Sequence, residues 1–164
     1  MMSVAPVASA GEAAGYYSNS DNYYFLGSLQ SLWMGEGAKA LGLEGNVRGD
    51  DLTAVLEGRL PDGSRLGKEV NGQHVHRPGH DLTFSAPKSV SILALIGNDK
   101  EMVEAHNHAV RVAAGYVEKL ISARDTKDGV TSIVHTGKMV AAAYTHDTSR
   151  NLDPQLHTHL LIAN

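Results

Sequence analysis

The pattern of apolar and polar positions predicts one clear strand and one long helix in the middle of the chain. Residues 81–86 alternate apolar with polar side chains, which is typical of a half-buried strand. Between residues 98 and 123, apolar residues recur at steps of three and four, so we expect the longest helix there. Asn98 and Glu101 have the spacing of a capping box at its start. The predicted apolar stripe consists of Val103, His106, Val110, Ala113, Val117 and Leu120.

The remaining elements complete the picture of an α+β fold. Expected strands cover residues 2–10 and 130–135, expected helices cover residues 29–41, 52–60 and 88–96, and residues 64–79 and 124–129 are expected to form a loop and a polar turn. Asp50 or Asp51 is predicted to cap the second of these helices. The order runs from a strand through helices, a strand and two further helices to three strands, which favours α+β over a strictly alternating parallel fold.

The last part of the chain is predicted to form an antiparallel hairpin with a long loop. Two apolar runs, residues 139–145 and 160–163, flank a polar connection that is rich in turn formers. His157 and His159 are two residues apart in the second strand, so their side chains point to the same face. If the loop places His146 opposite His157, three imidazoles converge on one side of the sheet.

Three converging imidazoles can hold adjacent positions around a divalent cation and leave other positions open, which suits a catalytic metal. The alternative is a set of hydrogen-bonded surface or half-buried histidines without a ligand. His74 and His76 have the same spacing but lack a strand setting, so we do not assign them as ligands.

Four of the six tyrosines of the chain lie within nine residues, as the pairs Tyr16-Tyr17 and Tyr23-Tyr24. If this segment is helical, the spacing of seven residues places one member of each pair on a shared face. Such tyrosines could pack an amphipathic helix onto a sheet. They could equally be nucleophiles, since a phenolic oxygen can attack phosphorus and form a covalent ester.

Composition limits the classes of protein that the chain can represent. The 164 residues with 42% hydrophobic and 20% charged content suit one soluble globular domain. The absence of cysteine excludes disulfides and thiolate metal sites. A formal net charge of −4 does not indicate nucleic-acid binding, which would have to depend on local patches and a bound cation. We expect no signal peptide and no membrane insertion, and a cytoplasmic location.

Three separated motifs, in order, resemble the conjugative relaxases, and most closely the relaxase-helicase proteins of F-like plasmids. They are the tyrosine pairs, residues 80–91 (His-Asp-Leu-Thr-Phe-Ser-Ala-Pro-Lys-Ser-Val-Ser) and residues 146–159, which end in His-Thr-His. The resemblance covers the whole chain. It implies a two-layer α+β sandwich in which helices pack on a central antiparallel sheet, similar to the rolling-circle initiator nucleases.

The resemblance also implies an activity and roles for individual residues. The expected reaction is site- and strand-specific nicking of single-stranded DNA at a transfer origin, with a tyrosine joined to the 5′ phosphate, for conjugative transfer. Accessory transfer proteins are expected partners, and Mg²⁺ or Mn²⁺ is the expected metal. The resemblance implies that Tyr16 is the nucleophile, that Tyr17, Tyr23 and Tyr24 are auxiliary tyrosines, and that His146, His157 and His159 are metal ligands. It also implies that Asp81 is the carboxylate that orients a histidine and accepts the tyrosine proton.

Three basic residues are candidates for contact with DNA phosphates. Arg150 lies inside the histidine loop, Lys88 lies in the first turn of a predicted helix, and Arg77 precedes the strand of Asp81. A solvated surface position is the alternative for Arg150 and Lys88, and Arg77 and Lys88 are the weaker candidates.

One departure from the family affects the domain assignment. Relaxase domains extend well beyond the His-x-His strand, and a helicase region follows, so residues 1–164 are expected to be the N-terminal part of a relaxase domain. Two alternatives stay open at this point: a truncated DNA-binding module that does not cut, and a cupin-like metal enzyme. The second needs a glutamate downstream of His-x-His, and none follows His159.

Overall fold

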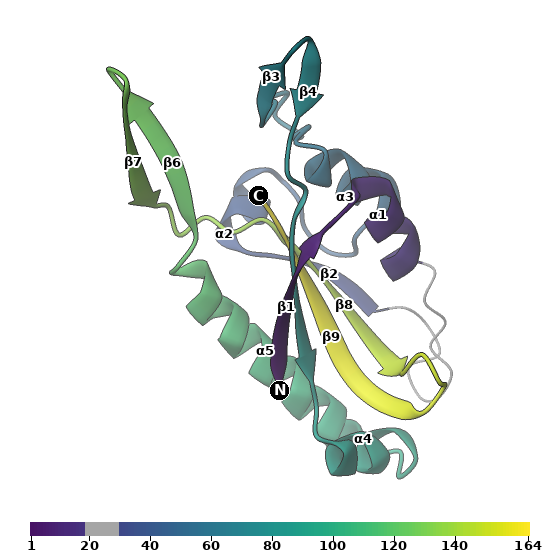
Figure 1. The fold of residues 1–164 in the computed structure, drawn as a ribbon. Helices are drawn as coiled ribbons and strands as arrows, with labels where there is room; N and C mark the ends of the chain where they lie inside the picture. Colours follow the sequence, from purple (N-terminus) through teal and green to yellow (C-terminus); the bar gives the residue numbers. More distant parts are fainter. Residues whose placement is uncertain (19–29) are drawn as a thin grey trace.

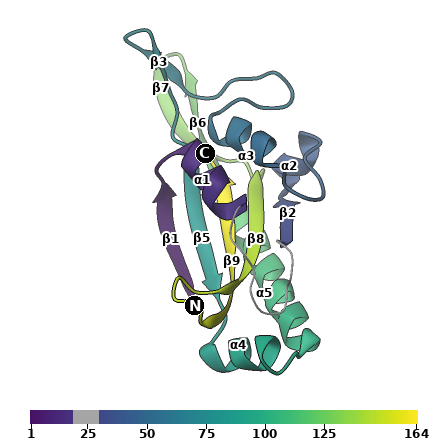
Figure 2. The ribbon, with the colours of Figure 1, turned by 90° about the vertical axis from the view of Figure 1, so that its right-hand side faces the viewer.

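The computed structural model describes residues 1–18 and 30–164, without the side chains of Tyr16, Ser18 and Gln30. Its centre is a five-stranded antiparallel sheet with the strand order β1-β5-β9-β8-β2 (Figures 1 and 2). The strands are β1 (Met2–Val7), β2 (Gln30–Met34), β5 (Gly79–Ser85), β8 (Ala141–Thr148) and β9 (Pro154–Ala163). The predicted α+β fold with a central antiparallel sheet is therefore confirmed.

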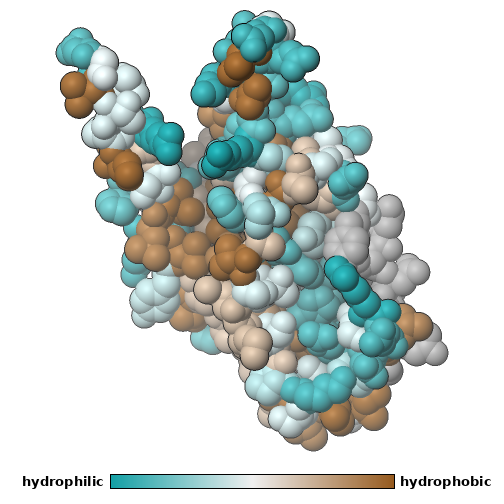
Figure 3. Space-filling model, viewed as in Figure 1, coloured by the Kyte–Doolittle hydropathy of each residue, from teal (hydrophilic) through white to brown (hydrophobic). Residues whose placement is uncertain are grey.

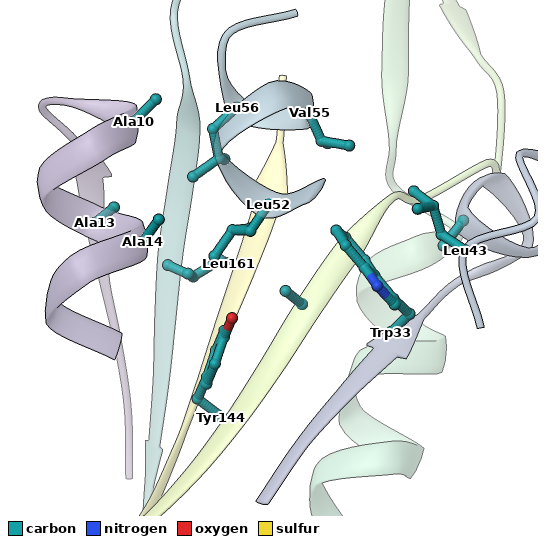
Figure 4. Packing of buried hydrophobic residues seen from close by; sticks show 12 residues of the cluster. Ala10, Ala13, Ala14, Trp33, Leu43, Leu52, Val55, Leu56, Tyr144 and Leu161 are labelled. Atoms are coloured by element: carbon teal, nitrogen blue, oxygen red, sulfur yellow. The ribbon is translucent and has the colours of Figure 1, made fainter. Parts of the chain in front are cut away.

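Helices cover both faces of this sheet, and β8 and β9 accordingly have buried residues on both sides. On one face, α1 (Ala10–Ser18) and α3 (Gly49–Leu56) pack over Tyr144 and Leu161 (Figure 4). On the other face, α5 (Lys100–Glu118) packs over the side chains that alternate with these two, Ala143 and Leu160 among them. The sheet and α5 form the expected two layers, and α1 and α3 cover the face of the sheet opposite α5 (Figure 2).

Of the segment predicted as a helix over residues 29–41, residues 30–34 form a strand, β2, and only residues 36–40 form a helix, α2 (Glu36–Ala40). Pairing of β2 with β8 overrides the helix propensity of its residues. The break falls at Gly35, which has φ +101°, and a Cβ there would collide with the backbone of Met139. Only glycine combines this backbone angle with such a close approach.

Two hairpins, of whose four strands the pattern predicted only residues 130–135, project from the body of the molecule (Figures 1 and 3). The expected loop over residues 64–79 contains β3 (Lys68–Val70) and β4 (Gln73–Val75). Of the expected turn over residues 124–129, residues 124–127 belong to β6 (Ser122–Lys127), and only residues 128–129 form the turn to the predicted strand β7 (Val130–His135). Nearly all their residues are exposed, so no alternation of buried and exposed positions marks them. The Asn71-Gly72 and Asp128-Gly129 pairs, all with positive φ, were the available signal for tight hairpin turns.

Helix ends also differ from the prediction. Asp99, not Asn98, caps α5, because its side chain accepts hydrogen bonds from the backbone N–H groups of Glu101 and Met102. Asn98 has φ +54° and lies outside the helix. Arg48 occupies the N-cap of α3, so Asp50 and Asp51 lie in its first turn instead of capping it. The helix α4 (Lys88–Leu95) agrees with the predicted element. None of the helices in the described part of the chain has the length and apolar character needed to cross a membrane.

Candidate metal centre and tyrosine contact

The three histidines of the predicted triad lie together on the face of the sheet that α1 covers. The β8–β9 register pairs His146 with His157 and Tyr144 with His159, as the hairpin prediction required. One ring nitrogen from each histidine can be chosen so that all three atoms lie within 4.8 Å of one another. The ring centroids are 5.0 to 5.4 Å apart. A single cation could therefore contact all three rings.

In each ring, one nitrogen makes a hydrogen bond and the other nitrogen is available to bind a cation. The Nδ1 atom of His157 donates to the carbonyl oxygen of Gln155 at 2.9 Å, and that of His159 donates to Asp81 Oδ2 at 2.8 Å. His146 makes a hydrogen bond with the backbone of Tyr17, while its Nε2 is buried and has no hydrogen-bond partner within residues 1–18 and 30–164. Metal-binding histidines show this division between the two nitrogens, so the donor set fits a cation.

The electrostatics of the triad favour neutral imidazoles. Burial lowers the pKa of His146 to about 4, and repulsion from His157 and His159 adds to the effect. Burial also lowers the pKa of His157. Near pH 7 both rings are therefore neutral, which is the form that binds a cation.

Asp81 connects this centre to the tyrosine helix. It lies on β5, is 8% exposed, and its Oδ2 accepts hydrogen bonds from Tyr17 Oη at 2.7 Å and from His159 Nδ1 at 2.8 Å. Its Oδ1 is buried and has no hydrogen-bond partner among the described residues. The hydroxyl of Thr83, two residues along the same strand face, lies 3.2 Å from His159 Nδ1. Thr83 was missed, although its position on the polar face of the alternating strand was a usable signal.

Tyr17 is the tyrosine that the structure brings into this centre. Its ring lies 4.8 Å from that of His159 and stacks at 6.5 Å on that of His146, measured between centroids. Tyr16 lies in α1, but its side chain is not described, and Tyr23 and Tyr24 lie outside the described residues. The nucleophile assignment thus stays a prediction.

The three basic candidates lie apart in the chain and differ in their contacts. Lys88 Nζ donates to the carbonyl oxygen of Pro154 at 3.0 Å, so it ties α4 to the start of β9. Arg150 is exposed in the loop between β8 and β9, and Arg77 is exposed between β4 and β5. Their contacts with DNA remain predictions. Within the described residues, His74 and His76 belong to no group of three or more potential metal ligands.

Comparison with known proteins identifies relatives over the whole chain. A sequence model of the TrwC relaxase matches residues 10–164. The chain is 54% identical over 164 residues to the multifunctional conjugation protein TraI of Escherichia coli strain K12, of which it spans 9%. The conjugative relaxase TrwC, solved in a metal-bound complex with oriT DNA, is 40% identical and superposes with a TM-score of 0.87, and this chain spans 57% of it. TrwC complexed with a 27-mer DNA comprising the recognition hairpin and the cleavage site is 38% identical, with a TM-score of 0.84 over 55% of that chain.

Proposed function

Because this chain belongs to the TrwC relaxase family, we propose that it carries the chemical centre of a relaxase that nicks single-stranded DNA at a transfer origin. One observation carries the proposal: Asp81 contacts both a tyrosine of the N-terminal pair and a histidine of the triad. The chain spans 9% of TraI and 57% of the solved TrwC chain, so the proposal concerns this centre alone. The family membership rejects the cupin-like alternative.

The proposed reaction is a transesterification at phosphorus. A tyrosine oxygen forms a bond to the scissile phosphorus, the bond from phosphorus to the 3′ oxygen breaks, and the 5′ phosphate stays on the tyrosine. The phenolic proton passes to a base, and the 3′ oxygen leaves as a hydroxyl after gaining a proton. Asp81 is the proposed base, since it already accepts a hydrogen bond at 2.7 Å from the hydroxyl of Tyr17, the chain neighbour of Tyr16. Tyr16 is the proposed nucleophile by its motif, and Tyr17, Tyr23 and Tyr24 are proposed to assist.

The proposed ligands of a divalent cation are His146, His157 and His159. When bound, the cation would polarise a non-bridging phosphate oxygen. Mg²⁺ and Mn²⁺ are the proposed ions, and three imidazoles favour Mn²⁺ of the two, because Mg²⁺ prefers oxygen ligands. The hydrogen bonds of His157 to Gln155 and of His159 to Asp81 support the assignment, since they orient the rings.

The proposed partner is single-stranded origin DNA, together with accessory transfer proteins. Arg150 and Arg77 are the proposed phosphate contacts, because both are exposed. Lys88 is a weaker candidate, since its ammonium group already donates to Pro154. Action on plasmid DNA would place the protein in the cytoplasm, which stays a prediction.

The nicking reaction is tested with the full chain, Mn²⁺ and single-stranded oligonucleotides that tile candidate transfer origins, including the oriT sequence that TrwC binds. We expect a covalent protein–DNA adduct, seen by mass spectrometry under denaturing conditions, that is lost in Tyr16→Phe. An adduct that survives Tyr16→Phe but is lost in Tyr17→Phe would move the nucleophile to Tyr17. Sequence-specific retention without any adduct would instead support a non-cleaving DNA-binding module.

The metal site is tested by the His157→Ala substitution. We expect bound Mn²⁺ and adduct formation to fall together, because one of three ligands is lost. His108→Ala, an exposed histidine on α5, is the matched control and should bind Mn²⁺ as the wild type does. Metal content that His157→Ala leaves unchanged would contradict the assignment of the triad.

A further inference from the structure

A buried histidine on α5 reaches the sheet directly behind the triad. His106 is 9% exposed, and its Nε2 lies 3.0 Å from the hydroxyl oxygen of Thr158. That hydroxyl lies 3.0 Å from the hydroxyl of Thr145, so the three side chains form one hydrogen-bonded chain. Thr158 stands between His157 and His159 in β9, and Thr145 precedes His146 in β8. The threonines therefore point to the α5 face while the triad points to the other.

These three hydrogen-bonded side chains lie beside apolar contacts between α5 and the sheet, and Thr145 and Thr158 also line a pocket with Asn107 and Arg111 of α5. The apolar contacts involve residues such as Ala114, Ala143 and Leu160. A buried polar group is costly unless it is hydrogen-bonded, and valine would fill the place of either threonine with a similar volume. Burial lowers the pKa of His106 to about 4, so the ring is neutral and has one N–H and one acceptor nitrogen. The three side chains thus add directional hydrogen bonds to the contact between α5 and the sheet.

The position of the polar chain matters for the register of the hairpin. Thr145 pairs with Thr158 in the step next to the pair of His146 and His157. Immediately beyond, between His146 and Thr148, the register of the two strands shifts. A slip of one residue would turn side chains to the opposite face of the sheet, so the last regular pairs need anchoring.

We propose that His106 is a positioning residue of the metal centre, which anchors Thr158 and Thr145 and thereby holds His146, His157 and His159 in register. The proposal rests on the proposed metal-binding function of the triad. His106 acts through the two threonines and touches neither metal nor substrate. Substitution of His106 should weaken metal binding by more than the accompanying loss of folding stability explains.

The experiment compares Mn²⁺ binding by calorimetry with the free energy of unfolding of the metal-free protein. The full chain is studied as the wild type and as His106→Leu, His106→Gln, Thr158→Val and Thr145→Val. We expect Mn²⁺ affinity to fall about tenfold in His106→Leu and Thr158→Val, the size typical of losing a residue that orients metal ligands. Thr145→Val should lose less, since the contact of His106 with Thr158 remains. His106→Gln keeps an amide donor and should recover part of the affinity.

Val110→Ala is the matched control, because Val110 lies one turn along α5 and is 5% exposed. It should lower stability by a similar amount without changing Mn²⁺ affinity. Equal affinities in the wild type, His106→Leu and Thr158→Val would overturn the inference, as would an affinity loss in Val110→Ala that matches theirs. Absence of Mn²⁺ binding by the wild type would refute the proposed metal function itself. Thr145→Val, the mildest change, remains informative if His106→Leu does not fold.

Discussion

Asp81 is the residue that joins the two halves of the candidate site. One of its oxygens accepts from Tyr17 on α1 and from His159 on β9, although these partners are 64 and 78 residues away in the chain. Hydrogen bonds to an ionised carboxylate are stronger than neutral ones, and burial strengthens them further. Asp81 therefore links the position of the tyrosine helix to the orientation of a metal ligand.

Replacing Tyr17 by phenylalanine tests this link. The substitution removes a 2.7 Å hydrogen bond to a buried carboxylate, so the free energy of unfolding should fall by about 2 kcal/mol. Urea denaturation of the metal-free protein measures the change. Tyr116→Phe is the control, because Tyr116 is 66% exposed on α5 and should change stability little. Equal losses in the two variants would show that the hydroxyl of Tyr17 contributes nothing specific.

At the scale of elements, α4 supports the start of β9 and so the strand that holds two of the triad histidines. Ser91 Oγ accepts from the buried backbone N–H of Leu156 at 3.0 Å, and the backbone N–H of Ala86 donates to the carbonyl of Leu156 at 3.0 Å. The side chain of Leu156 is fully buried against Leu95 and Val103. The residue before His157 is thus held by its backbone and by its side chain.

Ser91→Ala should destabilise the protein because it leaves the N–H of Leu156 buried without its partner. The expected loss in the free energy of unfolding is about 2 kcal/mol, measured by urea denaturation. Amide hydrogen exchange at Leu156 should also become faster, since the opening of this end of β9 costs less. Ser89→Ala provides the comparison, because Ser89 is exposed on the same helix. Slow exchange at Leu156 in both variants would argue against a supporting role for Ser91.

At the scale of the whole molecule, neutral buried histidines make stability depend on pH. The pKa values of His106 and His146 are lowered from 6.5 to about 4 in the folded protein. Between about pH 4 and pH 6.5, these two histidines bind protons in the unfolded chain but not in the folded protein. The stabilising contribution is therefore complete above pH 6.5 and decreases as the pH falls toward 4.

Acidification should accordingly weaken the metal-free protein well before carboxylates titrate. From pH 7.5 to pH 5, each of the two histidines is expected to lower the free energy of unfolding by about 2 kcal/mol. Urea denaturation at the two pH values after treatment with a chelator measures the decrease. His106→Gln removes one titrating group, so its decrease should be smaller than that of the wild type. A decrease of the same size in both proteins would contradict the pKa assigned to His106.

Much of the fold could be predicted, because the patterns involved are local. Period-two alternation identified β5, the apolar steps of three and four identified α5, and the two apolar runs around a polar loop identified the β8–β9 hairpin. The strand β2 could not be predicted in this way. Its residues are good helix formers, and only the neighbouring edge of β8 makes the extended conformation favourable.

The sequence by itself determined that His157 and His159 share a face and that a hairpin could return His146 to them, because strand geometry and turn residues act over a few positions. Only the tertiary structure decided that Tyr17 meets Asp81 and that His106 lies behind the triad on Thr158. These contacts join residues 64 and 52 positions apart. No local rule specifies which distant side chains meet, since that depends on how helices and strands pack into one core.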